Sequence, residues 1–250
     1  MLQNLPDVIG VLREGPLHRE LKALLAAPGD AFEVKVDGYV IDLVRQSGEL
    51  VEIQTGGFSP LRKKLDALLD RHPIRIVHPI PARRRIIRVD EDGVVLSTKA
   101  SPKKPTAATI FEGLVSFPTL LEHPNLTIEI LLTQEDHIRK PAPVRGRRYL
   151  RDPGERRLTE VLERIELRGP VDAAGLIPSF DEPFTTKELA KAMRVPLPLA
   201  QKTAHCLRAM DVLQPAGMRG RAPLHVLTPA APSRASASAR TRARRTRDSA

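Results

Sequence analysis

The stretch that decides the fold is AFEVKVDGYVIDLVRQSGELVEIQT, residues 31–55. It contains three runs of strand-forming residues, 31–37, 39–44 and 50–55, which are separated by Gly38 and by a polar turn. In the second and third runs, aliphatic side chains alternate with acidic or amide side chains, a pattern typical of strands with one buried face. We therefore expect three strands here, the last two joined as an antiparallel hairpin.

Helical patterns flank these strands on both sides. Before them, a leucine repeat follows Pro16, a residue suited to the first turn of a helix. After them, Ser59-Pro60 starts a second leucine repeat, and residues 74–77 form a short apolar run. The repeats consist of Leu17, Leu21, Leu24 and Leu25, and of Leu61, Leu65, Leu68 and Leu69. The order helix, three strands, helix, strand predicts an α/β core of about 80 residues.

The next part of the chain, from residue 82 to residue 135, is expected to extend the same domain. It contains a hairpin pattern over 86–89 and 94–98, a helical pattern over 109–121 and a strand pattern over 126–133.

Composition then divides the chain into four segments. We expect an α/β domain over 1–138, a basic linker over 139–154, a second domain over 155–228 that begins with a helix near 155–165, and a disordered basic tail over 229–250.

The charge of the chain points toward a polyanionic partner. The formal net charge is +10, and residues 231–250 alone contain six arginines and one aspartate. A basic excess in both the body and the tail favours nucleic acid. Aromatic residues make up only 3% and Trp is absent, so base stacking is not expected to dominate binding.

The sequence also restricts the compartment. A single cysteine, Cys206, excludes a disulfide within the chain and fits a reducing environment. No apolar stretch approaches the length of a membrane span or forms a signal peptide. We expect a cytoplasmic protein without a membrane partner.

The C-terminal segment has the pattern of a helix-turn-helix. Thr185 to Glu188 has the spacing of a capping box, with Thr185 as the N-cap. A short helix over 186–193, a turn at 194–196 and a longer helix over 197–210 follow.

A hairpin after the second helix resembles the wing of a winged-helix domain. Its loop contains Gly217 and Gly220, and residues 224–227 form the returning strand. The side chains expected to contact DNA are Gln201, Lys202, His205 and Arg208 on the second helix and Arg219 and Arg221 in the wing. A protein-interaction module is the alternative for such a small domain.

Two acidic residues are expected to meet on the central hairpin. A five-residue turn would place Val44 opposite Leu50 and Asp42 opposite Glu52, with Gln54 on the same face as Glu52. Opposed carboxylates repel each other, and a divalent cation between them removes the conflict. We expect Asp42 and Glu52 to hold Mg²⁺, with Mn²⁺ as an alternative ion.

A structural role is the alternative for these acids. Asp42 and Glu52 could instead face water at a sheet edge, or pair with Arg62 or Lys63. Those two cations, at the start of the second helix, are otherwise expected to hold a phosphate backbone.

The acidic pattern resembles the PD-(D/E)-x-K nuclease superfamily, in an uncharacterised bacterial branch with an E-x-Q variant. Asp42 is followed after nine residues by Glu52-Ile53-Gln54, between two helices. The resemblance implies a restriction-endonuclease-like core with a mixed sheet, and a catalytic set of Glu14, Asp42, Glu52 and Gln54. Glu20 is an alternative to Glu14, which could also simply complement the helix dipole.

The sequence departs from that family at two positions. Ile41 precedes Asp42 where the family often has Pro, and Gln54 replaces the usual Lys. Gln lacks a cationic head to stabilise developing negative charge. His18, one helical turn after Glu14, is expected to be a surface or packing residue.

The combined expectation is a Mg²⁺-dependent DNA endonuclease placed on its substrate by a winged helix. The alternative is a non-catalytic DNA-binding or regulatory protein that keeps the nuclease-like scaffold, and a protein–protein adaptor is a third candidate. A homodimer is compatible with the first, because cutting two strands needs two sites.

Overall fold

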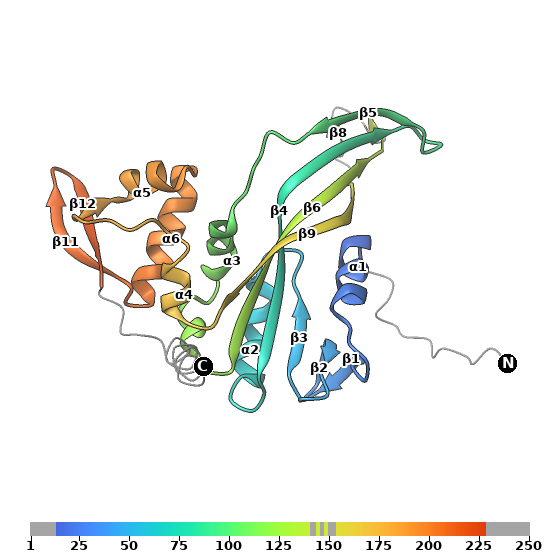
Figure 1. Cartoon of the computed structure of the whole chain (residues 1–250), viewed down its shortest axis with the longest axis horizontal. Coiled ribbons are helices and arrows are strands. Elements are labelled where there is room, and N and C mark those ends of the chain that lie inside the picture. The colour runs from blue at the N-terminus through green and yellow to red at the C-terminus, as the bar shows by residue number, and fades with distance from the viewer. Residues whose placement is uncertain (1–13, 141–143, 146–147, 150–153, 229–250) are drawn as a thin grey trace, which may run out of the picture.

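A seven-stranded mixed sheet forms the centre of the molecule (Figure 1), in a computed structural model that describes residues 14–140, 144–145, 148–149 and 154–228. The strand order is β1-β2-β3-β4-β6-β9, and β5 pairs with β4 beside this path. The strands are β1 (Ala31–Val36), β2 (Tyr39–Val44), β3 (Leu50–Ile53), β4 (Ile74–Val89), β5 (Val95–Ala100), β6 (Leu126–Arg139) and β9 (Glu155–Leu167). Strands β3, β4 and β6 are parallel and the remaining pairs are antiparallel. The expected α/β class with a mixed sheet is confirmed.

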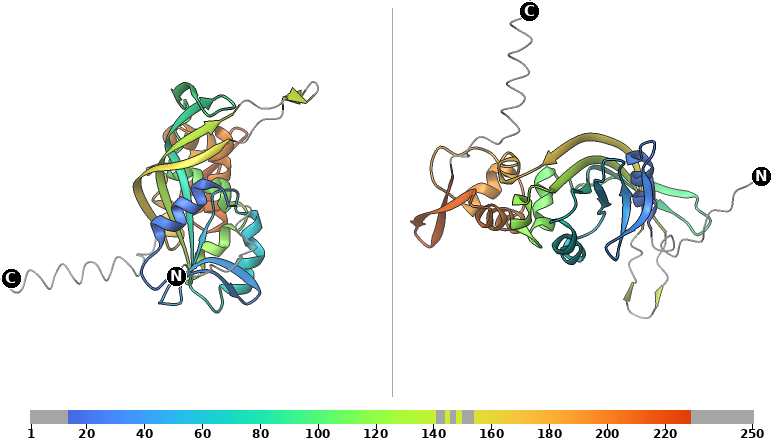
Figure 2. Two further views of the ribbon diagram at one scale, coloured as in Figure 1. Left: turned by 90° about the vertical axis from the view of Figure 1, so that its right-hand side faces the viewer. Right: turned by 90° about the horizontal axis from the view of Figure 1, so that it is seen from below.

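Helices cover both faces of this sheet (Figures 1 and 2). Helix α1 (Pro16–Leu25) packs on one face, where its buried leucines contact Leu43, Val51, Ile53, Val77 and Leu131. Helix α2 (Arg62–Leu68) packs on the other face, in a larger apolar cluster that continues to the C-terminal helices. The β2–β3 hairpin therefore lies between α1 and α2, since its side chains contribute to both clusters.

The β2–β3 hairpin has the register that the sequence predicts. Val44 pairs with Leu50 and Leu43 pairs with Val51. The turn between them is closed by hydrogen bonds from Arg45 N to Glu49 O and from Gly48 N to Arg45 O. Gly48 has a φ of +84°, which glycine adopts without steric cost.

Strand β4 is much longer than the expected run over 74–77, and its two prolines explain the difference. Val77 accepts a hydrogen bond from Gln54 N across the β3 edge, so Pro79 presents its nitrogen to that same edge, and Pro81 lies in the irregularity of the β4–β6 register between Ile80 and Arg83. Strand β3 has already ended there, and no ladder donor is lost. The strand therefore continues along β6 through both prolines to Val89.

The expected helix near 155–165 was wrong, because these residues form β9. Leu158 pairs with Glu135 and Val161 pairs with Thr133, so three residues on β9 oppose two on β6. This bulge changes the two-residue repeat of a strand into the three-residue spacing of a helix. Residues 155–167 therefore belong to the mixed sheet.

The expected helix over 109–121 was also wrong as a single element. Three short helices occupy the region: η3 (Ala107–Ile110), α3 (Phe111–Leu114) and η4 (Pro118–Glu122). Pro118 cannot continue the preceding helix, and the chain turns at Ser116 and Phe117 before it. Their apolar side chains pack into the larger cluster with α2.

The C-terminal part confirms the expected helices and hairpin. Helix α5 (Thr186–Met193) begins at a capping box of Thr185 and Glu188, and α6 (Leu197–Ala209) follows after a short turn. Strands β11 (Leu213–Arg219) and β12 (Ala222–Leu227) pair as a hairpin, with β10 (Phe184–Thr185) beside β12. The short helix α4 (Pro170–Ala174) connects β9 to this part.

The expected start of a second domain at 155 does not match the structure, because β9 belongs to the mixed sheet, and the other proposed boundaries stay predictions. Of the expected linker over 139–154, the structure describes 139–140, 144–145, 148–149 and 154, where β7 (Val144–Arg145) pairs with β8 (Arg148–Tyr149). The expected tail over 229–250 lies outside the described residues. Within the described ranges, no helix is long and apolar enough to cross a membrane.

Candidate metal centre

Three charged or polar side chains form a row at the start of α1 and along one of its faces. Glu14, just before the helix, His18 and Lys22 follow each other at intervals of four residues, so they lie one above another. Leu17 and Leu21 are offset by one residue from these positions and are buried against the sheet. The apolar face thus fixes the helix, and the polar face points along β2.

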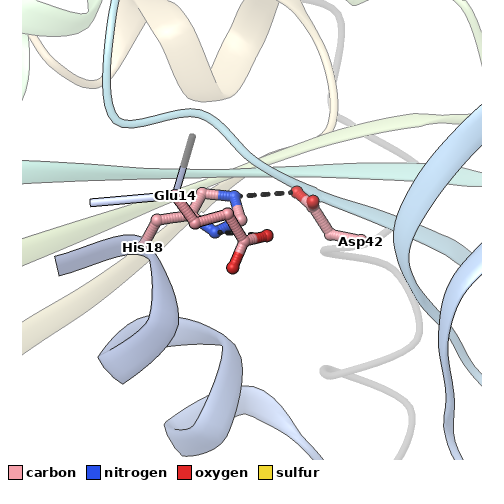
Figure 3. Close-up of side chains that lie close together, drawn as sticks. All are labelled: Glu14, His18 and Asp42. Carbon is pink, nitrogen blue, oxygen red and sulfur yellow. Dashed lines mark hydrogen bonds and ion pairs between the residues drawn. The ribbon is translucent and has the colours of Figure 1, made fainter. Parts of the chain in front are cut away.

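Asp42 on β2 meets this row (Figure 3). Its Oδ2 atom accepts hydrogen bonds from Ile53 N at 2.7 Å and from His18 Nε2 at 3.2 Å. On the other side of the imidazole ring, His18 Nδ1 lies 3.3 Å from Glu14 Oε1. Possible ligand atoms of Glu14, His18 and Asp42 all lie within 4.8 Å of one another. Three residues from two elements therefore converge.

These contacts shift two pKa values in opposite directions. Burial alone would raise the pKa of Asp42, but hydrogen bonds from His18 and Ile53 N outweigh it and lower that pKa. Burial alone would lower the pKa of His18, but the hydrogen bond and charge of Asp42, with the charge of Glu14, raise it. Asp42 is therefore ionised at neutral pH.

Lys22 and Glu33 belong to the same network, and neither was expected from the sequence. The Lys22 ammonium contacts the carboxylates of Glu14 and Glu33 and lies 3.9 Å from Asp42 Oδ1. Burial would lower the pKa of Lys22, but its hydrogen bonds to Glu14 and Glu33 raise it. The four-residue spacing from His18 was the signal for Lys22. Glu33 has a positive φ of 52°, an irregularity in β1 that no sequence pattern announces.

Glu52 lies next to this network but pairs with a different cation. It is buried, and Lys64 Nζ on α2 donates to its Oε1 at 2.7 Å. Burial raises the pKa of Glu52 to about 7, against the opposing effect of Lys64, and the charge of Asp42 adds to the increase. Neither Arg62 nor Lys63 is its partner, although both were considered from the sequence. The spacing of Lys64 from Leu61 and Leu68 shows that it shares their sheet-facing side.

Gln54 is held by the loop that follows β3. Its side-chain amide donates to Gly57 O at 2.5 Å, and its backbone carbonyl oxygen lies 2.5 Å from the ring nitrogen Nδ1 of His78. The amide therefore fixes the loop while it lines the same cavity as Asp42 and Glu52.

A cavity of about 460 Å³ opens over these residues. Its polar lining includes Glu14, His18, Glu33, Asp42, Glu52 and Gln54. With the two lysines that pair with them, the four carboxylates leave two uncompensated negative charges when all are ionised and His18 is neutral. A divalent cation has the charge that would balance this surplus.

The donor set fits such a cation. His18 Nδ1 is buried and has no hydrogen-bond partner within the described residues, although Glu14 Oε1 is near. Two carboxylates with one imidazole suit Mn²⁺ or Zn²⁺, whereas Mg²⁺ prefers oxygen ligands and would rely more on the carboxylates. Glu14, His18 and Asp42 are thus the residues that could hold the ion, with Glu52 beside them.

The alternative acid on α1, Glu20, lies elsewhere. Its Oε2 atom accepts a hydrogen bond from Leu158 N on β9 at 2.6 Å. Glu20 therefore fixes α1 to the sheet, and Glu14 is the acid that meets Asp42.

The remaining candidate residues lie on the surface. Lys63 is exposed, and Arg62 pairs with Asp66 at 2.9 Å. Arg219 pairs with Glu188 at 2.6 Å and donates to Pro183 O, so part of its charge is already neutralised. Four further candidates lie on α6 and one lies in the loop of the β11–β12 hairpin. All five are exposed: Gln201, Lys202, His205, Arg208 and Arg221.

The chain belongs to the family described as "Domain of unknown function (DUF8091)", which matches residues 15–168. That range runs from the start of α1 to the end of β9, and so covers the candidate centre except Glu14. A protein of Treponema pallidum (strain Nichols), named "Uncharacterized protein", is 30% identical over 226 residues, which cover 87% of this chain and 86% of that protein. No solved structure matches the chain.

Proposed function

We propose that this protein is a metal-dependent nuclease that hydrolyses DNA phosphodiesters, with a restriction-endonuclease-like core of the PD-(D/E)-x-K type. The observation that carries the proposal is the meeting of Glu14 with Asp42, beside Glu52 and Gln54, in one open cavity. These residues come from the chain just before α1, from β2, and from β3 and the residue after it, and the family resemblance assigned the same set to the site.

Separate residues would bind the metal ion and accept a proton. Glu14, His18 and Asp42 would hold the ion, which is Mg²⁺ or, given the imidazole, Mn²⁺. A divalent cation there would polarise the phosphodiester and activate water for attack. Glu52, with its pKa raised to about 7, can accept a proton close to neutral pH.

The site also contains the positive charge that Gln54 does not supply. The ammonium groups of Lys22 and Lys64 both lie among the carboxylates that line the cavity. An ammonium in this position can stabilise negative charge that develops on the phosphate. The replacement of the family lysine by Gln54 is therefore compatible with catalysis.

The C-terminal part would place the enzyme on DNA as a winged helix. The motivating features are a capped helix, a turn, a second helix with four exposed polar side chains and a basic hairpin. We include in the proposal a cytoplasmic location and a homodimer, since cleavage of both strands needs two sites.

Plasmid DNA incubated with the protein and Mn²⁺ or Mg²⁺ tests the proposal. Wild-type protein is expected to nick the plasmid, Asp42→Asn to lose this activity, and Asp70→Asn to retain it, because the Asp70 side chain is 88% exposed and does not line the cavity. Equal cleavage by wild type and Asp42→Asn would refute the site.

One observation favours a second function, a non-catalytic DNA-binding protein that keeps the scaffold. Lys22 and Lys64 already neutralise part of the carboxylate charge without any metal. Such a protein would bind DNA with the same affinity in the presence and absence of Mn²⁺, and the ion would not raise its stability.

A further inference from the structure

A second cavity, of about 370 Å³, adjoins the first and has the opposite charge. It lies where β4 has no partner on one side, between the end of β3 and the start of the β5 pairing. Pro79 and Pro81 line it, together with α3 and the side chain of Lys202 from α6. The missing strand beside β4 thus leaves room for a pocket, and Lys202 of α6 forms part of its wall.

The charge of this cavity comes from two arginines that share one acid. Arg156 donates to both oxygens of Glu135, at 2.9 Å each, and Arg84 Nη2 lies 3.5 Å from Glu135 Oε2. Glu135 is fully buried. Two guanidinium groups against one carboxylate leave a surplus positive charge at the cavity wall.

Further groups increase the suitability for an anion. Arg84 Nε is buried and has no hydrogen-bond partner in the described part of the chain, so one donor remains unsatisfied. Lys202 adds a positive charge from α6, and the exposed Glu112 is the acid on the lining. Burial lowers the pKa of His78, which is therefore neutral at neutral pH.

The two cavities are continuous in their lining. Thr55 and Gly56, which follow β3, line both. A polynucleotide strand carries a phosphate at every residue, and guanidinium and ammonium groups are its usual partners. A strand with one phosphodiester at the carboxylates would bring a neighbouring phosphate to the arginines.

We propose that the cavity of Arg84, Arg156 and Lys202 binds a phosphate of the DNA strand next to the phosphodiester that is cleaved. This inference rests on the proposed nuclease function. It also changes the role of Lys202: instead of reading a DNA groove with its neighbours on α6, it contacts the substrate strand beside the sheet.

Binding without metal tests this inference separately from catalysis. The probe is a fluorescein-labelled single-stranded decanucleotide in EDTA, followed by anisotropy. Lys202→Gln is expected to weaken binding about five-fold. It should also lower by about one the number of cations released on binding, which is obtained from the dependence of the affinity on salt concentration. Lys202→Arg should restore both. Lys191→Gln, an exposed charge change on α5, should bind like wild type.

Three results would overturn the inference. The first is equal affinity of wild type and Lys202→Gln, and the second is an equal loss in Gln201→Ala and Lys202→Gln, which indicates that the strand binds along the exposed surface of α6 and not in the cavity. The third is Lys202-dependent stabilisation by inorganic phosphate without any binding of the oligonucleotide, which indicates a site for free phosphate. If the strand binds as expected but Asp42→Asn cleaves like wild type, the nuclease assignment of the carboxylates fails while the phosphate site stands.

Discussion

His18 and Asp42 are 24 residues apart in the sequence and are joined by a hydrogen bond of 3.2 Å between Nε2 and Oδ2. This bond connects α1 to β2 (Figure 3), and both residues line the carboxylate cavity. Because the same ring approaches Glu14 with its other nitrogen, His18 determines how the two acids are spaced.

The stability contributed by His18 should depend on pH. Its pKa is raised in the folded protein, so its contribution is complete below the pKa of the unfolded chain, near 6.5, and is lost as pH rises through the folded value. We expect His18→Gln to lower the free energy of unfolding by about 1–2 kcal/mol at pH 5.5 and by much less at pH 9, from urea denaturation. An equal loss at both pH values would contradict this.

Glu52 should give the opposite pH dependence to that of an ordinary paired carboxylate. Its pKa is about 7 in the folded protein against an ordinary value of 4.5, so the folded state binds more protons between these values and loses stability as pH rises. Relative to Glu52→Gln, wild type should lose up to about 3 kcal/mol between pH 4 and pH 8. The exposed Glu122→Gln provides the control, and a pH-independent difference would show that Glu52 titrates normally.

The neighbouring acids Glu135 and Asp136 should differ strongly in their effect on stability. Glu135 is fully buried between Arg84 and Arg156, so Glu135→Ala leaves two partly buried cations without this partner and should cost about 3 kcal/mol. Asp136 pairs with the half-exposed Arg85, and Asp136→Ala should cost less than about 1 kcal/mol. Thermal and urea denaturation would measure both, and similar losses would disagree with this description.

The capping box of α5 should contribute measurably to the C-terminal part. Thr185 Oγ1 accepts from Glu188 N, and the Glu188 carboxylate accepts from Thr185 N at 2.7 Å. Thr185→Ala should lower the free energy of unfolding by about 1 kcal/mol. Thr185→Ser retains the acceptor and should recover most of this loss, whereas an equal loss in both variants would point to the methyl group instead.

Elements with local signals were predictable from the sequence. The capping box and Pro196 fixed the bounds of α5 and α6, and the turn after Val44 fixed the register of the β2–β3 hairpin. In these places the residues that determine the structure are adjacent along the chain, so propensity and spacing are sufficient.

Elements shaped by their neighbours were not. The helical spacing of Leu158 and Val161 results from a bulge that exists only because β6 lies beside β9. The strand expected over 74–77 stops before Pro79 and Pro81, because the point at which β4 loses β3 as a partner is set by the tertiary structure. Both the spacing of buried residues along a strand and the tolerance of a strand for proline depend on which strand lies beside it.

The candidate centre was predictable in three of its four acids, all but Glu33, and less so in its cations. Glu14, Asp42, Glu52 and Gln54 line one cavity, as their order along the chain indicated. Lys22 and Lys64 were missed although helical spacing indicated which way each side chain faces, because their partners Glu33 and Glu52 lie on other elements and sequence spacing does not encode that pairing.

Thermal unfolding with and without Mn²⁺ at pH 8 tests most directly whether the carboxylate cavity binds a divalent cation. Wild type and Asp70→Asn should be stabilised by about 2–3 kcal/mol when Mn²⁺ exceeds its dissociation constant about 100-fold, and Asp42→Asn should lose this effect. An unchanged melting temperature of wild type, or an equal increase in Asp42→Asn, would contradict the account.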